Sequence, residues 1–164
     1  MKKSLQKKLE ATIKDSLDSH KKMTGYQENI FKVIDLLTKS ILKGGKLLLC
    51  GNGGSAADAQ HLAAEFLVRL RPKINRAPLP AITLAQDTST ITALANDYDF
   101  KYLFSRNFKA LVKKNDVLIF VQSKKKDILK RLKKRKNFNQ KLLNKFKKIQ
   151  LSLAYKKKKS HYII

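Results

Sequence analysis

The chain opens with two segments whose apolar residues recur at helical spacing. Residues 4–22 are largely charged, and their apolar positions fall four apart at Leu5, Leu9, Ile13 and Leu17. Residues 27–43 carry a wider apolar face, formed by Ile30, Val33, Ile34, Leu37 and Ile41. This spacing predicts two amphipathic helices. Thr24-Gly25 separates them and Gly44-Gly45 ends the second, so we expect residues 1–45 to form an N-terminal helical region.

Three short apolar runs follow, at residues 46–50, 81–84 and 117–121. Each has the length and composition of a strand buried on both faces. Segments of helical pattern separate or follow them, at residues 56–70, 88–96 and 102–112. Thr88-Ser89-Thr90 is the candidate cap of the second of these helices. Alternating strands and helices predict an α/β fold with a doubly wound parallel sheet, which in this chain has three strands.

The composition limits the setting in which the chain works. A single cysteine, Cys50, excludes a disulfide framework and favours a reducing, cytoplasmic location. We interpret Cys50 as a buried strand residue rather than a nucleophile. No apolar run is long enough to cross a membrane, and no apolar signal-peptide segment follows the first lysines.

The net charge of +25 is concentrated near the C-terminus. Residues 120–164 hold 17 Lys and Arg against one acid, Asp127, whereas residues 1–119 hold 20 against 11. A uniformly basic domain indicates a nucleic acid or an anionic surface as partner. Because the excess charge lies in the tail, it says little about what the first part of the chain does.

A glycine-rich turn joins the first predicted strand to the helix that follows it. Gly51-Asn52-Gly53-Gly54-Ser55 has almost no side-chain bulk. Backbone N–H groups at a helix start attract anions, and glycine allows a phosphate or sugar to approach closely. The turn matches neither the dinucleotide-binding fingerprint nor the phosphate-binding loop of nucleotide hydrolases. Taken alone, it is equally compatible with a simple tight connection.

His61 and Glu65 lie four residues apart on the same predicted helix, and so on one face of it. An imidazole and a carboxylate at this spacing are suited to bind one divalent metal ion, and Glu65 is also a candidate general base. An exposed histidine beside an ordinary surface glutamate has the same spacing.

The motif GNGGSAADAQH, with Glu65 four positions further on, resembles the sugar isomerase (SIS) domain of the phosphoheptose isomerases. The similarity continues through PAITLAQDTSTITALANDYDFKYLFSRNF and covers roughly Lys46–Ile119, and more loosely the N-terminal helices. It implies a SIS-type sheet and the isomerisation of sedoheptulose 7-phosphate to glycero-manno-heptose 7-phosphate, for the heptose of lipopolysaccharide or capsule. It also implies a cytoplasmic homotetramer whose N-terminal helices pack together.

The resemblance assigns roles to residues of this sequence. It implies that Glu65 is the catalytic base and that His61 and Glu65 bind one zinc ion per subunit. The phosphorylated seven-carbon sugar is bound in this pattern by Asn52, Gly53, Gly54, Ser55, Glu65, Asn96 and Asp97. Without the resemblance, Asn96-Asp97 fits a loop turn better than a substrate site. A close non-enzymatic relative in this branch binds a replication initiator protein, and that regulatory function is the alternative.

The family pattern is lost near Phe120. The phosphate-binding Ser-Thr-Ser-Gly loop is replaced by Val121-Gln122-Ser123-Lys124. The C-terminal helix with its Gln and zinc-binding His is not found, and His161 lacks the matching context. We therefore divide the chain into residues 1–45, a partial SIS domain at 46–121, and a lysine-rich tail at 122–164 that is truncated or atypical.

Two interpretations of the tail remain open. One is a basic helix that binds nucleic acid or a membrane, although nucleic acid and membrane partners are not what the resemblance implies. The other is a change of reading frame near residues 119–124, because AT-rich DNA read out of frame yields lysine, asparagine and isoleucine. The frame change is the interpretation favoured by the abrupt rise in charge and the lost phosphate loop.

Overall fold

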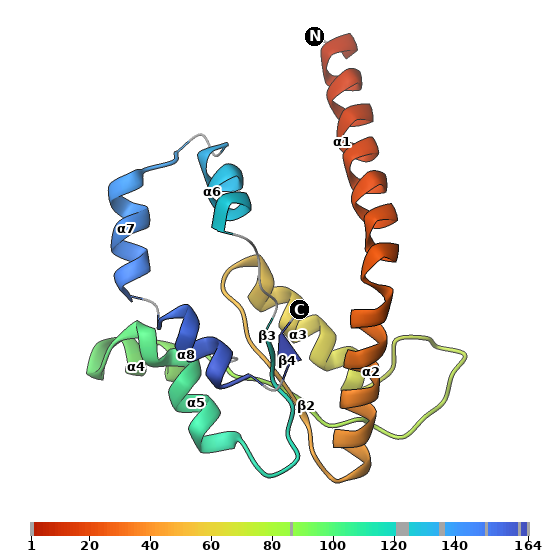
Figure 1. Cartoon of the computed structure of the whole chain (residues 1–164), viewed down its shortest axis with the longest axis vertical. Coiled ribbons are helices and arrows are strands. Elements are labelled where there is room, and N and C mark those ends of the chain that lie inside the picture. The colour runs from red at the N-terminus through yellow and green to blue at the C-terminus, as the bar shows by residue number, and fades with distance from the viewer. Residues whose placement is uncertain are drawn as a thin grey trace. The chain divides into compact units, whose positions relative to one another are not determined.

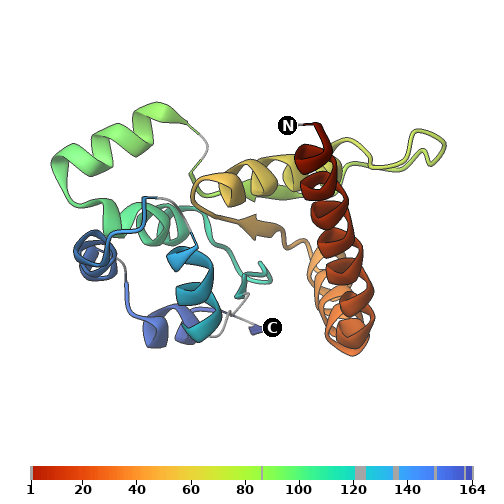
Figure 2. The ribbon, with the colours of Figure 1, turned by 90° about the horizontal axis from the view of Figure 1, so that it is seen from above.

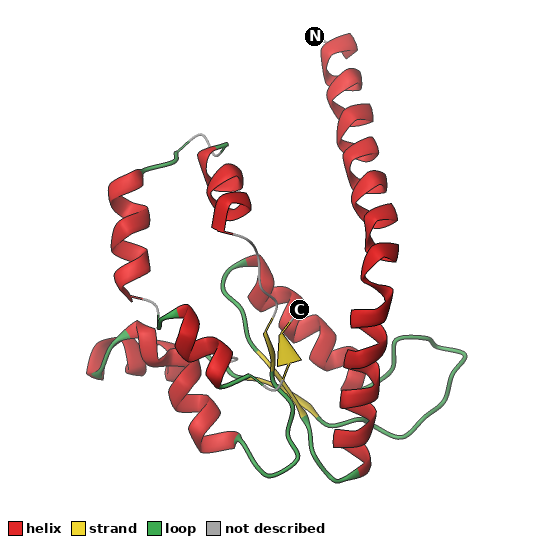
Figure 3. Ribbon diagram, in the orientation of Figure 1, coloured by secondary structure: helices red, strands yellow, loops and turns green. Residues whose placement is uncertain are grey.

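The computed structural model describes residues 2–85, 87–120, 125–134, 137–149, 151–160 and 162–163. Figure 3 colours its helices, strands and loops. The chain divides into two units, Met1–Asp35 and Leu36–Ile164. In the described part of the chain, every helix is too short or too polar to pass through a lipid bilayer.

The first unit is helical, as the apolar periodicity predicts. α1 (Lys2–Lys22) is followed by a short 3-10 helix, η1 (Met23–Tyr26), and by the start of α2 (Gln27–Leu42). Thr24 and Gly25 therefore lie in a tighter helix rather than in an open break. The apolar stripe of α1 is exposed, with relative accessibilities of 51% to 61% for its four members. Covering apolar side chains of this size with a partner surface lowers the free energy, because apolar area is removed from water.

The second unit is built on parallel strands: β1 (Leu47–Leu49), β2 (Ala81–Thr83), β3 (Ile119–Phe120) and β4 (Tyr162–Ile163). β1 pairs with β2 in the register Leu47 to Ala81. Val117, just before β3, bridges Leu47 in parallel, and its carbonyl accepts from the Leu48 N–H at 3.1 Å. Successive N–H groups of a strand point to opposite sides, so β1 lies between β2 and the segment that leads into β3.

β4 is a strand that the sequence did not predict. It pairs in parallel with β3, in the register Ile119 to Tyr162 and Phe120 to Ile163. The parallel α/β arrangement is thus confirmed, and the lysine-rich tail adds one short strand beside β3. Two residues are few for a strand, because most strands have about five.

Helices connect and follow the strands of the second unit (Figure 1). They are α3 (Gly54–Leu67), α4 (Thr88–Asp97), η2 (Phe100–Tyr102), α5 (Leu103–Leu111), α6 (Lys125–Lys133), α7 (Gln140–Ile149) and α8 (Leu153–Lys158). α3 packs on β1 and β2, where Ala63 meets Leu47 and Ala81 in the buried cluster. Leu37, Leu49 and Phe66 extend this apolar contact. The core therefore lies directly beneath the helix that carries His61 and Glu65.

Helix boundaries differ from the prediction where local capping decides them. α3 begins at Gly54 and ends at Leu67, so it takes in part of the glycine turn and stops three residues early. α4 is capped by Asp87, whose Oδ1 accepts from the Thr90 N–H at 2.6 Å, and not by Thr88, Ser89 or Thr90. This backbone bond from Thr90 is the main cause that lowers the pKa of Asp87.

The interpretation of Cys50 as a buried strand residue is wrong. β1 ends at Leu49, and Cys50 is exposed immediately after it. The chain leaves the sheet here because it must turn into the glycine-rich connection. Leu48, two residues earlier, is among the most buried side chains described, at 2%.

Asp116 connects the amino ends of β1 and of the segment that leads into β3. Its side chain is 1% exposed and accepts from the Lys46 N–H at 3.0 Å, the Lys46 ammonium at 2.5 Å and the Lys113 N–H at 2.7 Å. The Ser40 hydroxyl donates to the neighbouring Asn115 carbonyl at 2.5 Å, which joins the end of α2 to the same network. Burial by itself raises the pKa of Asp116, but the bonds from Lys46 and Lys113 outweigh it and lower the pKa.

The connection from β1 to α3 depends on close backbone packing at Gly51. A Cβ at this position would lie 2.5 Å from the Ser55 carbonyl oxygen and 2.6 Å from its carbonyl carbon. Gly53 has φ +58° and ψ −127°, a conformation that is strained for any residue with a side chain. Gly54, by contrast, has open space around it and lies in the helix.

We predict that Asp116→Asn lowers the free energy of unfolding by about 2 kcal/mol near neutral pH, since charge-assisted bonds to a buried group are lost. The folded-state pKa lies below the ordinary value of 3.8, so the wild-type contribution is present above that pH and is lost as pH falls through the folded pKa. Urea unfolding across this range measures both effects. Asp18→Asn, an exposed change on α1, is the control. Equal acid sensitivity of wild type and Asp116→Asn would contradict the prediction.

We predict that Gly51→Ala destabilises the chain by about 2 kcal/mol, because the added methyl group collides with the backbone of Ser55. Gly54→Ala is the matched control, since it has room and replaces glycine inside a helix, which favours stability slightly. Thermal and urea unfolding of both variants test this difference, and a Gly51→Ala variant as stable as Gly54→Ala would show that the turn tolerates bulk.

Candidate functional site

The glycine turn lies at the carboxyl end of β1, where an open α/β sheet binds its ligands. The Ser55 N–H donates to the Asn52 carbonyl at 3.2 Å, and the Ala56 N–H donates to the Gly53 carbonyl at 3.0 Å. Residues 52–55 are all exposed. The N-cap is Gly53, which makes no side-chain capping bond, so no side chain of the cap residue offsets the positive end of the α3 dipole.

His61 and Glu65 are brought together on the exposed side of α3. Their Nε2 and Oε1 atoms lie 3.4 Å apart, with the His61 side chain 78% exposed and that of Glu65 22% exposed. The second carboxylate oxygen of Glu65, Oε2, is buried and has no hydrogen-bond partner among the described residues. A buried acceptor without a partner costs free energy. Such an atom is expected where a ligand, metal ion or substrate proton completes the bonding.

Asn96 and Asp97 lie together at the end of α4. The Asn96 Nδ2 donates to the Asp97 Oδ1 at 3.0 Å, and both residues are exposed. They are the last two of the 10 residues of α4, a helix of about 15 Å, and so lie far from its start beyond β2. Within the described residues, no hydrogen bond or ion pair joins them to the glycine turn or to Glu65. The predicted sugar-binding residues therefore form two groups rather than one connected cluster.

The metal ligands that the structure describes are incomplete. It contains no group of three or more His, Cys, Asp and Glu side chains that could hold a metal ion among the residues it describes. Catalytic zinc sites in proteins normally have three protein ligands. His61 and Glu65 are suited to two of these three positions. The Glu65 carboxylate also has one oxygen, Oε2, without a hydrogen-bond partner among the described residues. Ser123 and His161, considered in the sequence, lie outside the described residues.

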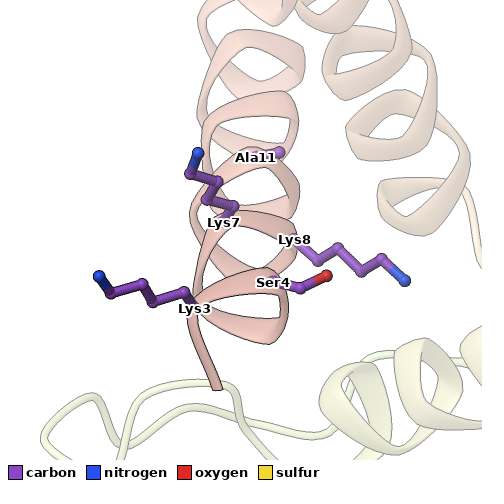
Figure 4. Close-up of a pocket in the computed structure, with 5 residues that line it drawn as sticks. All are labelled: Lys3, Ser4, Lys7, Lys8 and Ala11. Carbon is purple, nitrogen blue, oxygen red and sulfur yellow. The ribbon is translucent and has the colours of Figure 1, made fainter. Parts of the chain in front are cut away.

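A hollow on α1 does not belong to this site. It is lined by Lys3, Ser4, Lys7, Lys8 and Ala11. Figure 4 shows that all five rise from one helix, with Lys3 and Lys7 pointing away from Lys8. A binding pocket normally closes around a ligand with side chains from several elements, so this surface carries no candidate chemistry.

Arg76 is a residue of the site that sequence reasoning missed. Its guanidinium donates to the Glu65 carbonyl at 2.5 Å and to the Phe66 carbonyl at 2.9 Å, at the end of α3. Only one signal for this contact exists in the sequence: a cation in the loop that follows a helix can bond the last carbonyls of that helix. Nothing in the spacing of 11 residues specifies which loop cation does so.

Comparisons with known proteins agree with this geometry. The family model described as SIS domain matches residues 11–126. A phosphoheptose isomerase of Campylobacter concisus is 45% identical over 119 residues, which cover 70% of this chain and 62% of that protein. One from an Azoarcus species is 49% identical over 94 residues, or 57% of this chain and 47% of the relative.

Solved structures give the same result. A phosphoheptose isomerase of Neisseria gonorrhoeae superposes with a TM-score of 0.63 at 36% identity, covering 73% of this chain and 61% of that one. One from Francisella tularensis gives 0.65 at 30% identity. The chain spans less than two thirds of the length of these relatives. The matched residues include both the strand-turn-helix unit and Asn96-Asp97, and the chain belongs to the SIS domain family.

Proposed function

We propose that this chain carries the isomerase site of a phosphoheptose isomerase, which converts sedoheptulose 7-phosphate into glycero-manno-heptose 7-phosphate. The observation that carries the proposal is the Glu65 carboxylate, with one oxygen beside His61 and the other buried without a partner. The phosphoheptose isomerases among the relatives support the substrate class. The product would serve the heptose of a surface polysaccharide, made in the cytoplasm.

The reaction is a proton transfer between neighbouring carbons. Glu65, as general base, removes a proton from C1 of the ketose and gives an enediol. The same proton is returned at C2, and the hydroxyl proton on O1 moves to O2, so that an aldose forms without gain or loss of atoms. A carboxylate that is only 22% exposed has few waters around it to take up the proton, which favours its return to the sugar.

The exposed turn at the carboxyl end of β1 is the proposed sugar site. Asn52, Gly53 and Gly54 present backbone groups and one amide, and Ser55 adds a hydroxyl at the helix start. Asn96 and Asp97 would hold further hydroxyls. Their separation from the turn in the described contacts implies that the sugar itself joins the two groups.

Zinc fits this site in part. His61 Nε2 and the Glu65 carboxylate would hold it, and zinc when bound polarises sugar oxygens. The remaining ligands are not among the described residues. A measurement of zinc binding therefore also distinguishes the isomerase from a binding protein of the same fold, which would need no zinc at this position.

A homotetramer is the proposed assembly. Its support is the exposed apolar stripe of α1, which extends over roughly three and a half helical turns. Exposed apolar area of this extent marks a contact surface. A second copy of the same helix offers the matching apolar surface.

We predict that Glu65→Gln lowers the turnover of sedoheptulose 7-phosphate by on the order of 100-fold or more, because the amide cannot accept the proton. Zinc binding, measured by calorimetry, weakens as well, since a carboxylate ligand is lost. Glu28→Gln makes the same chemical change on exposed α2 and leaves both unchanged. A wild-type chain that neither turns over the sugar nor binds zinc would refute the proposed function.

We predict that Leu9→Lys shifts the assembly toward monomers in light scattering with size separation, because a charge is placed in the apolar stripe. Ala11→Lys adds the same charge to another face of α1 and leaves the molecular mass unchanged. If both variants keep the wild-type mass, α1 does not form the contact.

A further inference from the structure

We propose that Arg76 is a positioning residue for Glu65, which it orients through the backbone of the last turn of α3. The inference rests on the proposed function, because it takes Glu65 as the reacting carboxylate. Arg76 touches neither of the carboxylate oxygens in the described contacts. Its effect on the reaction would therefore be transmitted through the helix end.

Three hydrogen bonds from one guanidinium define the contact. Arg76 Nη2 donates to the Glu65 carbonyl at 2.5 Å, while Nη1 donates to the carbonyls of Phe66 and Ala77, both at 2.9 Å. Arg76 is half-buried, so water competes less for these bonds. A planar fork of fixed geometry holds two neighbouring carbonyls at a set distance, which a flexible ammonium cannot do.

The end of α3 explains why these carbonyls need a donor. The last intrahelical bond runs from the Val68 N–H to the Ala64 carbonyl at 2.8 Å. The next two carbonyls, of Glu65 and Phe66, would be paired by residues 69 and 70 in a longer helix, but α3 has ended. Arg76 binds both, and the Leu79 N–H also donates to Phe66 at 3.0 Å. The guanidinium charge further stabilises the negative end of the helix.

The Glu65 side chain depends on this backbone. Of its two oxygens, one faces the mostly exposed His61 and the other has no partner among the described residues. No described bond to another rigid element holds the carboxylate. The position of the carboxylate then depends on where the last turn of α3 holds the Glu65 Cα. A displacement of a reacting group by about 1 Å can slow a reaction by about 100-fold.

Arg76 also joins α3 to the loop that follows it. This loop, residues 68–80, makes an open excursion between α3 and β2 (Figure 2). Arg76 and Leu79 bring it back to the helix end. The loop supplies Arg71 as a matched control, because it is an exposed arginine whose side chain makes none of these bonds.

The test compares Arg76→Gln, Arg76→Lys and Arg71→Gln in the full chain. We expect Arg76→Gln to lower kcat for sedoheptulose 7-phosphate at least tenfold with little change in KM, because the sugar-binding turn lies at the other end of α3. Arg76→Lys keeps the charge but not the fork, and should recover only part of the loss. Arg71→Gln should retain wild-type values.

A double-mutant cycle separates positioning from a merely structural role. Arg76→Gln should weaken zinc binding and slow turnover when Glu65 is present, and add no further loss in a Glu65→Gln background. Equal losses in both backgrounds would overturn the proposal, since Arg76 would then act on the fold as a whole. Unfolding measurements confirm that each variant is folded.

One further readout does not depend on activity. Amide hydrogen exchange at Val68 and Leu79 reports the bonds that close the end of α3. We expect these two amides to exchange at least tenfold faster in Arg76→Gln than in the wild type. In Arg71→Gln we expect them to exchange at the wild-type rate. If the wild type neither turns over sugar nor binds zinc, the proposed function fails. In that case unchanged exchange in Arg76→Gln would also overturn the role of Arg76.

Discussion

The buried Asp116 carboxylate connects the amino ends of the central strands, and the placement of the site follows from it. It accepts from the backbone and side chain of Lys46 before β1 and from Lys113 before β3. These bonds all lie at the amino ends of the strands, and none of them involves the carboxyl end of β1. There Cys50 leaves the sheet and the glycine turn begins. The polar bonds at the amino ends of the strands thus leave the carboxyl ends available for ligand binding.

Much of this fold can be predicted from local patterns of apolar and polar residues in the sequence. The apolar runs near Leu47, Ala81 and Val117 indicate the strands, and the four-residue spacing from Leu5 onward indicates α1. Such periodicity depends only on which face is buried, so it can be read without the structure. The ends of elements are less local. Asp87 caps α4 in place of the three residues after it, because its carboxylate reaches the Thr90 N–H.

The interactions that sequence could not predict join residues far apart. Asp116 is 70 residues from Lys46, and Arg76 is 11 residues and one loop from Glu65. Neither pair leaves a periodic signal, because each is created by how the elements pack. The spacing of His61 and Glu65 predicted a shared face, and their contact confirms it. The partnerless oxygen of Glu65 could be found only in the structure.

The lysine-rich tail differs from the rest of the chain in its charge and in lying almost entirely outside the family match. The family match extends to residue 126, and every residue of the proposed site lies before that point. Beyond it lie 14 of the 17 cations that follow residue 119, and the one acid there, Asp127, precedes all of them. Their mutual repulsion must be met by counterions or an anionic partner. The tail does add β4 beside β3, so it covers a sheet edge without supplying, in its described residues, a further zinc ligand. Zinc affinity of the full chain therefore measures directly whether two ligands suffice here or a further element completes the site.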